Sequence, residues 1–554
     1  MVFNSVDFFV FFAIVYCLYR TLPLSGQNWL LLVAGYVFYG WWDVRFLFLI
    51  AFSTTVDFWI GLLLAKGEVP RRQRTIASLF LVGAAACFLN LDWAAIFRLQ
   101  LGAILAPNPI GLWTLAGTVC VVVLANLLHG RIGTLTPDRR KRLLLFTTVA
   151  VNLGFLGVFK YFNFFSDSAR EALTSLGWNA DLFHLDVVLP VGISFYTFQS
   201  LSYTIDSGRG LVKPVERFWN FALFVAFFPP MVAGPIERAR HLLPQLLTKR
   251  RVRLNQSIYG IQLILYGLFK KVAVADGLAS SVNAVYNSTG QVSTSDVALA
   301  TLLFAFQIFC DFSGYTDIAR GVAKLLGIEL ALNFDLPYFS RNPSEFWRRW
   351  HISLSSWLRD YLYIPLGGNR KGNIRTYVNL MTTMTLGGLW HGAAANFVLW
   401  GSYQGLLLCG HRALTGREEK LPSGVKLEAD APPSMPHRAI QRLKSLARIA
   451  FFFPFICYGW LLFRATSFDQ IVTFSSKLIG LGPSVSSVIP QPPLAAILGL
   501  LVLIGLQFAE WIDGRRDCYR FWPRPVQGVL YAVLIFTLAM GMSNAPAQFI
   551  YFQF

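Results

Sequence analysis

The sequence is short of charged residues. Asp, Glu, Lys and Arg make up only 14% of the 554 residues, while hydrophobic residues reach 55%. A soluble domain carries about a quarter of charged residues. The apolar runs also follow one another without a long hydrophilic block. This composition excludes a string of soluble domains and predicts an all-α polytopic membrane protein.

Acidic residues are scarcer than basic ones, with 29 Asp and Glu against 48 Lys and Arg, and the formal net charge is +19. A basic surplus can indicate binding to nucleic acid. Here the cations fall in short loops between apolar runs, as retention on the cytoplasmic side of a membrane requires. We therefore predict no nucleic acid partner.

The seven cysteines are scattered and show no CxxC or Cys/His ligand spacing. This pattern argues against a disulfide framework and a structural zinc site, so we expect no metal and no bound cofactor. The N-terminus lacks the positive n-region and the cleavage site of a signal peptide, since its first basic residue is Arg20. We expect an uncleaved first helix that starts outside.

Basic loops at 66–74 and 129–142 are expected in the cytoplasm, and the connections between them outside. Continued along the chain, this alternation gives about 11–14 crossings in one membrane domain, 1–554, with both termini outside. The domain has five parts: N-terminal helices 1–206, a re-entrant and basic cytoplasmic segment 207–256, a catalytic core 257–411, a cytoplasmic loop 412–447 and C-terminal helices 448–554.

The apolar run 221–235 contains the double proline Pro229 and Pro230 and is flanked by basic residues on both sides. Proline removes a backbone donor and clashes with the preceding helical turn, which excludes one continuous helix. We expect a re-entrant segment. Its unpaired backbone must then be buried in protein or line a cavity.

The motif DFSGYTDIARG, 311–321, lies toward the cytoplasmic end of a predicted helix. An ion pair between Asp317 and Arg320, one turn apart, is the favoured structural interpretation of Asp317. In the functional interpretation, Asp311 or Tyr315 lines the cavity. For Asp311 the sequence leaves both open.

The segment EFWRRWHISLSSWLRDY, 345–361, predicts one helix with an aromatic face beside a cationic face. The first face carries Trp347, Trp350, Leu354, Leu358 and Tyr361, and the second carries Arg348, His351, Ser355 and Arg359. Such a helix can anchor at the bilayer interface. Alternatively, Arg348, Arg349 and Arg359, with Arg370 nearby, bind the phosphates of an acyl donor, since arginine forms forked contacts with phosphate. Both roles are compatible.

His391 lies in LGGLWHGAAANFVLWG, 386–401, within a stretch without charged residues from Thr376 to Gly410. As a helix, the chain from Arg375 to His391 spans roughly 24 Å. We therefore expect a hairpin whose turn holds His391 deep in the ~30 Å hydrocarbon core or near its outer side. A core histidine bonded to a carbonyl is the structural alternative, but an ionisable residue at such depth is costly and points to function.

Together, DFSGYTDIA, FWRRWHISLSSWLRDYLYIPLGG and LWHG resemble the membrane-bound O-acyltransferase (MBOAT) family, in particular its bacterial polysaccharide O-acetylation branch typified by the alginate O-acetyltransferase AlgI. The resemblance implies a helical bundle with re-entrant and interfacial helices around a central cavity. It also implies that His391 is the catalytic histidine and that His351 has a supporting or donor-side role. If His351 is cytoplasmic, the two histidines are expected apart unless His351 also enters the cavity.

A histidine near neutral pKa can take the proton of an attacking hydroxyl. With the resemblance, this implies transfer of an acyl group, most of all acetyl, from a cytoplasmic thioester such as acetyl-CoA. Trp390 and the Gly392 amide are candidate oxyanion donors. The resemblance further implies a bacterial inner membrane, an extracytoplasmic acetyltransferase partner protein and a polysaccharide acceptor, besides membrane lipid. The alternatives are an acyl-histidine relay, a transporter or flippase, and a structural subunit of a polysaccharide export complex.

Overall fold

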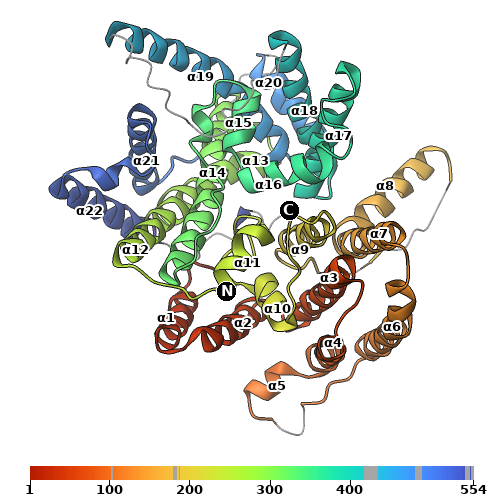
Figure 1. Ribbon diagram of the computed structural model, residues 1–554. Helices are drawn as coiled ribbons and strands as arrows, with labels where there is room; N and C mark the ends of the chain where they lie inside the picture. Colours follow the sequence, from red (N-terminus) through yellow and green to blue (C-terminus); the bar gives the residue numbers. More distant parts are fainter. Residues whose placement is uncertain are drawn as a thin grey trace. The chain divides into compact units, whose positions relative to one another are not determined.

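The computed structural model describes residues 1–100, 104–178, 184–185, 188–416, 435–480, 489–542 and 549–550, without the side chains of 435–439. These residues fold mainly into helices, as Figure 1 shows. The all-α class predicted from composition is therefore confirmed. Half of the predicted cytoplasmic loop 412–447, residues 417–434, lies outside the described residues, and residues 435–447 are helical.

Within the described ranges, nine helical stretches are long and apolar enough to cross a membrane. They are Val44–Lys66, Arg71–Asn90, Pro109–Gly133, Pro137–Ser175, Leu254–Tyr286, Thr294–Leu325, Ile440–Arg464, Leu494–Asp513 and Arg524–Gly541. These stretches establish a multi-pass membrane protein. The total of 11–14 crossings and the outer location of both termini stay predictions.

The chain forms two compact units, of which the first comprises residues 1–264 and 318–331. Its helices are α1 (Val6–Thr21), α2 (Leu24–Gly40), η1 (Val44–Phe46), α3 (Leu47–Lys66), α4 (Arg71–Asn90), α5 (Trp93–Phe97), α6 (Pro109–Gly133), α7 (Pro137–Leu156), η3 (Gly157–Tyr161), α8 (Phe162–Ser175), α9 (Ile193–Gly208), α10 (Phe218–Ala226), α11 (Ala239–Leu247) and most of α12 (Leu254–Leu268).

The second unit comprises residues 265–317 and 332–554. Its helices are η4 (Phe269–Asp276), α13 (Gly277–Tyr286), most of α14 (Thr294–Leu325), η5 (Pro337–Phe339), α15 (Pro343–Arg349), α16 (Ile352–Leu358), η6 (Arg359–Tyr363), α17 (Asn373–His391), α18 (Ala395–Thr415), α19 (Met435–Arg464), α20 (Phe468–Leu478), α21 (Leu494–Asp513), η7 (Cys518–Phe521) and α22 (Arg524–Gly541). The single domain 1–554 predicted from the sequence stays a prediction.

Helix α3 forms the centre of the first unit and packs against α4, α7, α9 and α10. Its carboxylate Asp57 is fully buried and accepts hydrogen bonds from Thr148 and Asn152 of α7. A charged or polar group inside a membrane domain needs such partners, since lipid offers none. This polar contact therefore ties α3 to α7.

The double proline ends a helix where the sequence predicts a break. Helix α10 stops at Ala226, and Pro229 and Pro230 follow in an irregular, fully buried segment that leads to α11. Burial in protein is the condition under which non-helical backbone is tolerated at membrane depth. Re-entry from the cytoplasmic side stays a prediction.

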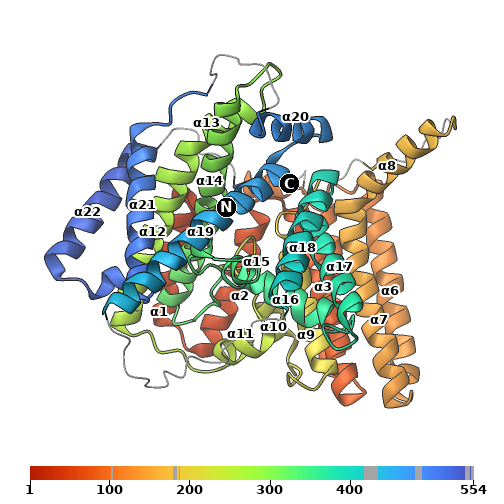
Figure 2. The same cartoon turned by 90° about the horizontal axis from the view of Figure 1, so that it is seen from above.

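The predicted hairpin around His391 is confirmed. Helix α17 ends at His391, a short turn follows, and α18 returns beside it, as Figures 1 and 2 show. Gly388 and Gly401 lie against each other, and a Cβ added at either position would collide with the backbone of the other helix. Glycine permits this close approach, and the hairpin fixes the place of His391.

Candidate active site

His391 is the last residue of α17, and its side chain is only 5% exposed. Aromatic rings surround its imidazole. The ring centroids of Trp390 and Trp400 are each 5.0 Å away and that of Phe463 is 5.4 Å away. The imidazole therefore lies among aromatic rings, which keep water away from it.

The segment 345–361 is not one helix, which corrects the sequence prediction. Helix α15 ends at Arg349, His351 adopts a left-handed conformation with φ 43° and ψ 54°, and α16 begins at Ile352. A side chain other than glycine is strained there by about 1–3 kcal/mol, and such strain persists only where the surroundings enforce it. The break turns His351 into the interior, where it is fully buried.

The aromatic face of this segment is also buried rather than presented to lipid. Trp347 and Trp350 belong to the hydrophobic core of the second unit, and Trp350 packs on Trp460 with 4.7 Å between ring centroids. The interfacial anchor expected for these two residues is therefore wrong. They hold the broken helix in the core, and so they position His351.

Asn333 holds the His351 ring. Its Oδ1 lies 3.1 Å from Nδ1 of His351, and it also accepts hydrogen bonds from the backbone N–H and the hydroxyl of Ser353. A backbone N–H can only donate, which identifies the Asn333 atom as oxygen. Nδ1 of His351 must therefore carry the proton, and Nε2 is left as the acceptor.

Burial lowers the pKa of His351 to about 3, because the protonated ring would lose its hydration. At neutral pH the ring is uncharged. It can accept or relay a hydrogen bond, but it does not supply a positive charge.

The two histidines lie near each other, contrary to the separation expected if His351 were cytoplasmic. Their ring centroids are 6.4 Å apart, and Trp390 contacts both rings, at 5.9 Å from His351 and 5.0 Å from His391. The structure therefore brings together His391, His351 and Trp390, all three predicted as site residues.

Asp311 and Tyr315 lie on α14. Asp311 is buried and pairs with Lys271 at 2.7 Å, and its other oxygen accepts a hydrogen bond from the backbone of Ile550 at 2.7 Å. The Tyr315 ring lies 5.2 Å from Phe549. Phe312, also on α14, contacts the site, since its ring centroid lies 4.7 Å from that of His351. These contacts indicate that Asp311 anchors the chain near its C-terminus.

Asp317 forms an ion pair with Lys270 of η4. The pair with Arg320 that the sequence predicts stays a prediction. Helix α14 continues through the whole DFSGYTDIARG motif to Leu325, so the motif lies in the C-terminal half of the helix. The ion pair with Lys270 supports the structural interpretation of Asp317. Helical spacing does not reveal this partner, because Lys270 belongs to another helix.

The arginines predicted to bind a donor lie around the broken helix. Arg349 pairs with Glu345 at 2.9 Å and donates to the Asp335 carbonyl. Arg359 is exposed and pairs with its neighbour Asp360, and Arg348 is half-buried. Arg349 is therefore held as part of the α15 framework, while the exposed pair of Arg359 is of the kind that contributes about 0–1 kcal/mol and is easily exchanged.

Two further residues of the site were missed in the sequence. Asn333 lies in an irregular stretch without a motif, and only the structure shows its contact with His351. Trp400 is 1% exposed beside His391, and its indole N–H has no hydrogen-bond partner among the described residues. An unused donor in a buried place is costly unless a ligand accepts from it. The signal for Trp400 in the sequence was its position in the helix that follows the LWHG motif.

Comparison with known proteins identifies the family of the chain. The model of the MBOAT, membrane-bound O-acyltransferase family, matches residues 216–420. The chain is 35% identical to the probable alginate O-acetylase AlgI of Pseudomonas putida over 584 aligned positions, which cover 100% of both proteins. It is also 35% identical to the protein of that name in Pseudomonas aeruginosa, over 95% of this chain and 83% of the relative.

A relative with a different named acceptor is the peptidoglycan O-acetyltransferase of Helicobacter pylori. The identity is 34% and covers 62% of this chain and 66% of the relative. The matched family region 216–420 contains both histidines, Trp390 and Trp400. The full-length similarity and the family match together establish that the chain belongs to the membrane-bound O-acyltransferase family and is an O-acyltransferase.

Proposed function

We propose that this protein transfers an acetyl group from a cytoplasmic thioester, such as acetyl-CoA, to a hydroxyl on the outer side of a bacterial inner membrane, for the O-acetylation of a polysaccharide. The names of the relatives support this choice, since they denote O-acetylases of alginate and of peptidoglycan. The acceptor is the glycan itself or a side chain of an extracytoplasmic acetyltransferase partner protein. We also propose that both termini lie on the outer side of the membrane.

His391 acts as the general base in this proposal. The single observation that carries it is the imidazole enclosed by Trp390, Trp400 and Phe463 at the tip of the α17–α18 hairpin. As the acceptor oxygen attacks the thioester carbonyl, its proton passes to His391. The tetrahedral intermediate then expels the thiolate, and the imidazolium returns the proton to it. The apolar surroundings disfavour hydrolysis of the thioester by water.

His351 supports the base as a neutral, oriented ring. Asn333 fixes its tautomer, so Nε2 can accept a hydrogen bond from a hydroxyl of the acceptor other than the attacking one and hold the acceptor for attack. The proximity of the two rings supports this role over a remote donor-side role. A covalent acyl-histidine relay is not required.

Trp400 is the donor that we propose for the oxyanion. Its buried N–H lacks a partner among the described residues and belongs to a ring in contact with His391. A donor that is fixed before the reaction stabilises the developing charge without reorganisation. Trp390, which touches both histidine rings, is the second candidate.

Donor binding is proposed for the arginines that follow His351. Arg359 and Arg370 lie on an exposed surface, where a phosphate of the donor can replace Asp360 as the partner of Arg359. Arg348 remains a candidate on the other side of the break. Arg349 keeps its framework role with Glu345.

The test is the O-acetyl content of cell polysaccharide in cells that lack the native protein and carry wild type, His391→Ala or His411→Ala at matched membrane abundance. His411 is the control, a partly buried histidine on α18 of the same hairpin that faces Ser344. We expect acetylation with wild type and His411→Ala and none with His391→Ala. Full acetylation with His391→Ala would exclude His391 as the base.

A further inference from the structure

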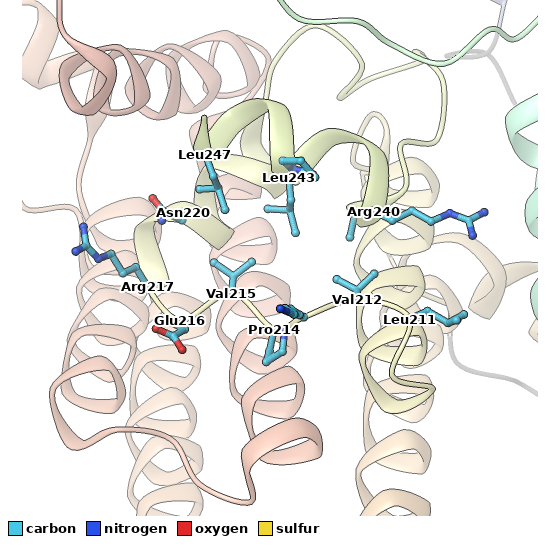
Figure 3. A pocket seen from close by; sticks show the side chains of 13 residues that line it. Leu211, Val212, Pro214, Val215, Glu216, Arg217, Asn220, Arg240, Leu243 and Leu247 are labelled. Carbon is cyan, nitrogen blue, oxygen red and sulfur yellow. The ribbon is translucent and has the colours of Figure 1, made fainter. Parts of the chain in front are cut away.

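The first unit carries two adjoining cavities with volumes of about 520 and 320 Å³. They share Arg217, Asn220 and Leu247, and so they form one groove. The larger cavity, shown in Figure 3, lies between the connection 211–217 and α11. The smaller one extends it to residues 24–32 of α2. A volume of this size suits a small ligand or a lipid headgroup.

The lining of the groove is strongly cationic. Lys213, Arg217 and Arg240 line it, and no carboxylate among the described residues pairs with any of them. The acidic residue of the larger cavity, Glu216, is already paired with Lys66 at 2.5 Å. Three positive charges are therefore left for an anionic ligand. Figure 3 shows Arg217 and Arg240 at opposite ends of the larger cavity.

The rest of the lining is apolar. In Figure 3, Leu243 and Leu247 of α11 face Val212, Pro214 and Val215 across the cavity. Such walls offer few hydrogen-bonding groups to a sugar or a nucleobase, but they suit the glycerol and the first methylene groups of a lipid.

An apolar track continues from the smaller cavity. Trp29 of α2 lines this cavity and packs on Trp219 with 5.0 Å between ring centroids. From there Trp29, Val33 and Val37, four residues apart on one face of α2, are 48%, 57% and 44% exposed. Tryptophan is enriched at the headgroup level of membranes, and an exposed valine face suits an acyl chain.

We propose that this groove is a binding site for an anionic glycerophospholipid. The phosphate contacts Arg217 and the neighbouring cations, and an acyl chain follows Trp29, Val33 and Val37 along α2. A lipid with two phosphates would reach both Arg217 and Arg240. Basic pockets of this kind on the cytoplasmic side of membrane helices bind such headgroups.

The apolar track decides for a lipid and against a soluble phosphate compound such as a nucleotide. A nucleotide would use the cations but would leave the α2 face unfilled. The proposal does not rest on the acyl transfer reaction, since all its residues belong to the first unit and none to the proposed active site.

The experiment measures lipid binding to the purified full-length protein by native mass spectrometry, with phosphatidylglycerol, cardiolipin or phosphatidylcholine added. The variant is Lys213→Gln/Arg217→Gln/Arg240→Gln. The matched control is Arg139→Gln/Lys141→Gln/Arg142→Gln, which removes three exposed cations from the first turns of α7 in the same unit. Both variants change the net charge equally.

We expect wild type to retain an anionic lipid and not phosphatidylcholine. The groove variant should bind it at least roughly tenfold more weakly, and the control should stay within about twofold of wild type. Equal losses in both variants would reduce the effect to general charge attraction and overturn the proposal. Displacement of the lipid by 3′,5′-ADP, with binding of that nucleotide, would also overturn it. If the triple variant does not fold, Arg217→Gln and Arg240→Gln tested singly should each weaken binding severalfold, and unchanged binding in both would contradict the site.

Discussion

The position of His391 should depend on the contact between Gly388 and Gly401. A Cβ added at Gly388 would lie 2.8 Å from Cα and 2.9 Å from N of Gly401, and still closer to the carbonyl oxygen of Phe397. Carbon atoms in contact are normally about 3.5–4.0 Å apart, so α17 and α18 would have to separate by about 1 Å. His391 lies less than one turn further along α17 and would move with it.

A displacement of about 1 Å can lower the rate roughly 10²-fold when it misplaces a reacting group. We therefore expect Gly388→Ala to reduce acyl transfer by about this factor at normal membrane abundance. Gly387→Ala is the matched control. It makes the same change in the same helix, but its Cβ would meet only the flexible tip of Leu358 at 3.0 Å.

The assay is transfer of labelled acetyl groups by membranes that contain equal amounts of each variant. Alanine favours a helix over glycine by about 1 kcal/mol at both positions, so helix propensity cannot separate the two variants. We expect Gly387→Ala to stay within a few fold of wild type. Full activity of Gly388→Ala, or equal loss in both variants, would refute the link between helix spacing and the place of His391.

Three further predictions concern the surroundings of the histidines. Asn333→Ala should lower the stability of the protein in thermal unfolding, because it leaves the N–H donors of His351 and Ser353 without an acceptor, at roughly 1–3 kcal/mol each. Asn333→Asp keeps an acceptor and should lose less stability. Equal losses of stability in the two variants would contradict this reasoning. Because the pKa of His351 is about 3 in the folded protein and ~6.5 when unfolded, only the unfolded chain takes up a proton as the pH falls below neutral. Stability should therefore decline between about pH 6.5 and 4, and His351→Asn should show a shallower decline; an identical slope would argue against a neutral buried ring. Trp400→Phe, which keeps the ring but removes the N–H, should lower kcat by about 10²-fold with little change in KM, and an unchanged kcat would exclude it as the oxyanion donor.

The sequence predicted the features that depend on composition and helix length. The α17–α18 hairpin followed from an uncharged run of about two helix lengths with glycines in its middle, and the break after Ala226 followed from Pro229 and Pro230. Both rest on local rules, because glycine and proline act on the backbone wherever they occur.

The features that depend on tertiary contacts could not be predicted in this way. The spacing of aromatic residues in 345–361 fits a continuous helix, yet burial of Trp350 and the contact with Asn333 hold His351 in a left-handed conformation that no pattern reveals. For the same reason the proximity of His351 to His391 was missed. Asp317 likewise pairs with Lys270, which is distant in sequence.

The most direct test of the account follows the donor instead of the product. Purified protein in lipid nanodiscs is mixed with acetyl-CoA and a hydroxyl acceptor such as an alginate oligosaccharide, and release of the free thiol is recorded for wild type, His391→Asn and His351→Asn. We predict acceptor-dependent thiol release by wild type, none above background for His391→Asn, and a reduced rate for His351→Asn. Thiol release by His391→Asn at the wild-type rate would contradict the central claim that His391 is the base of the reaction.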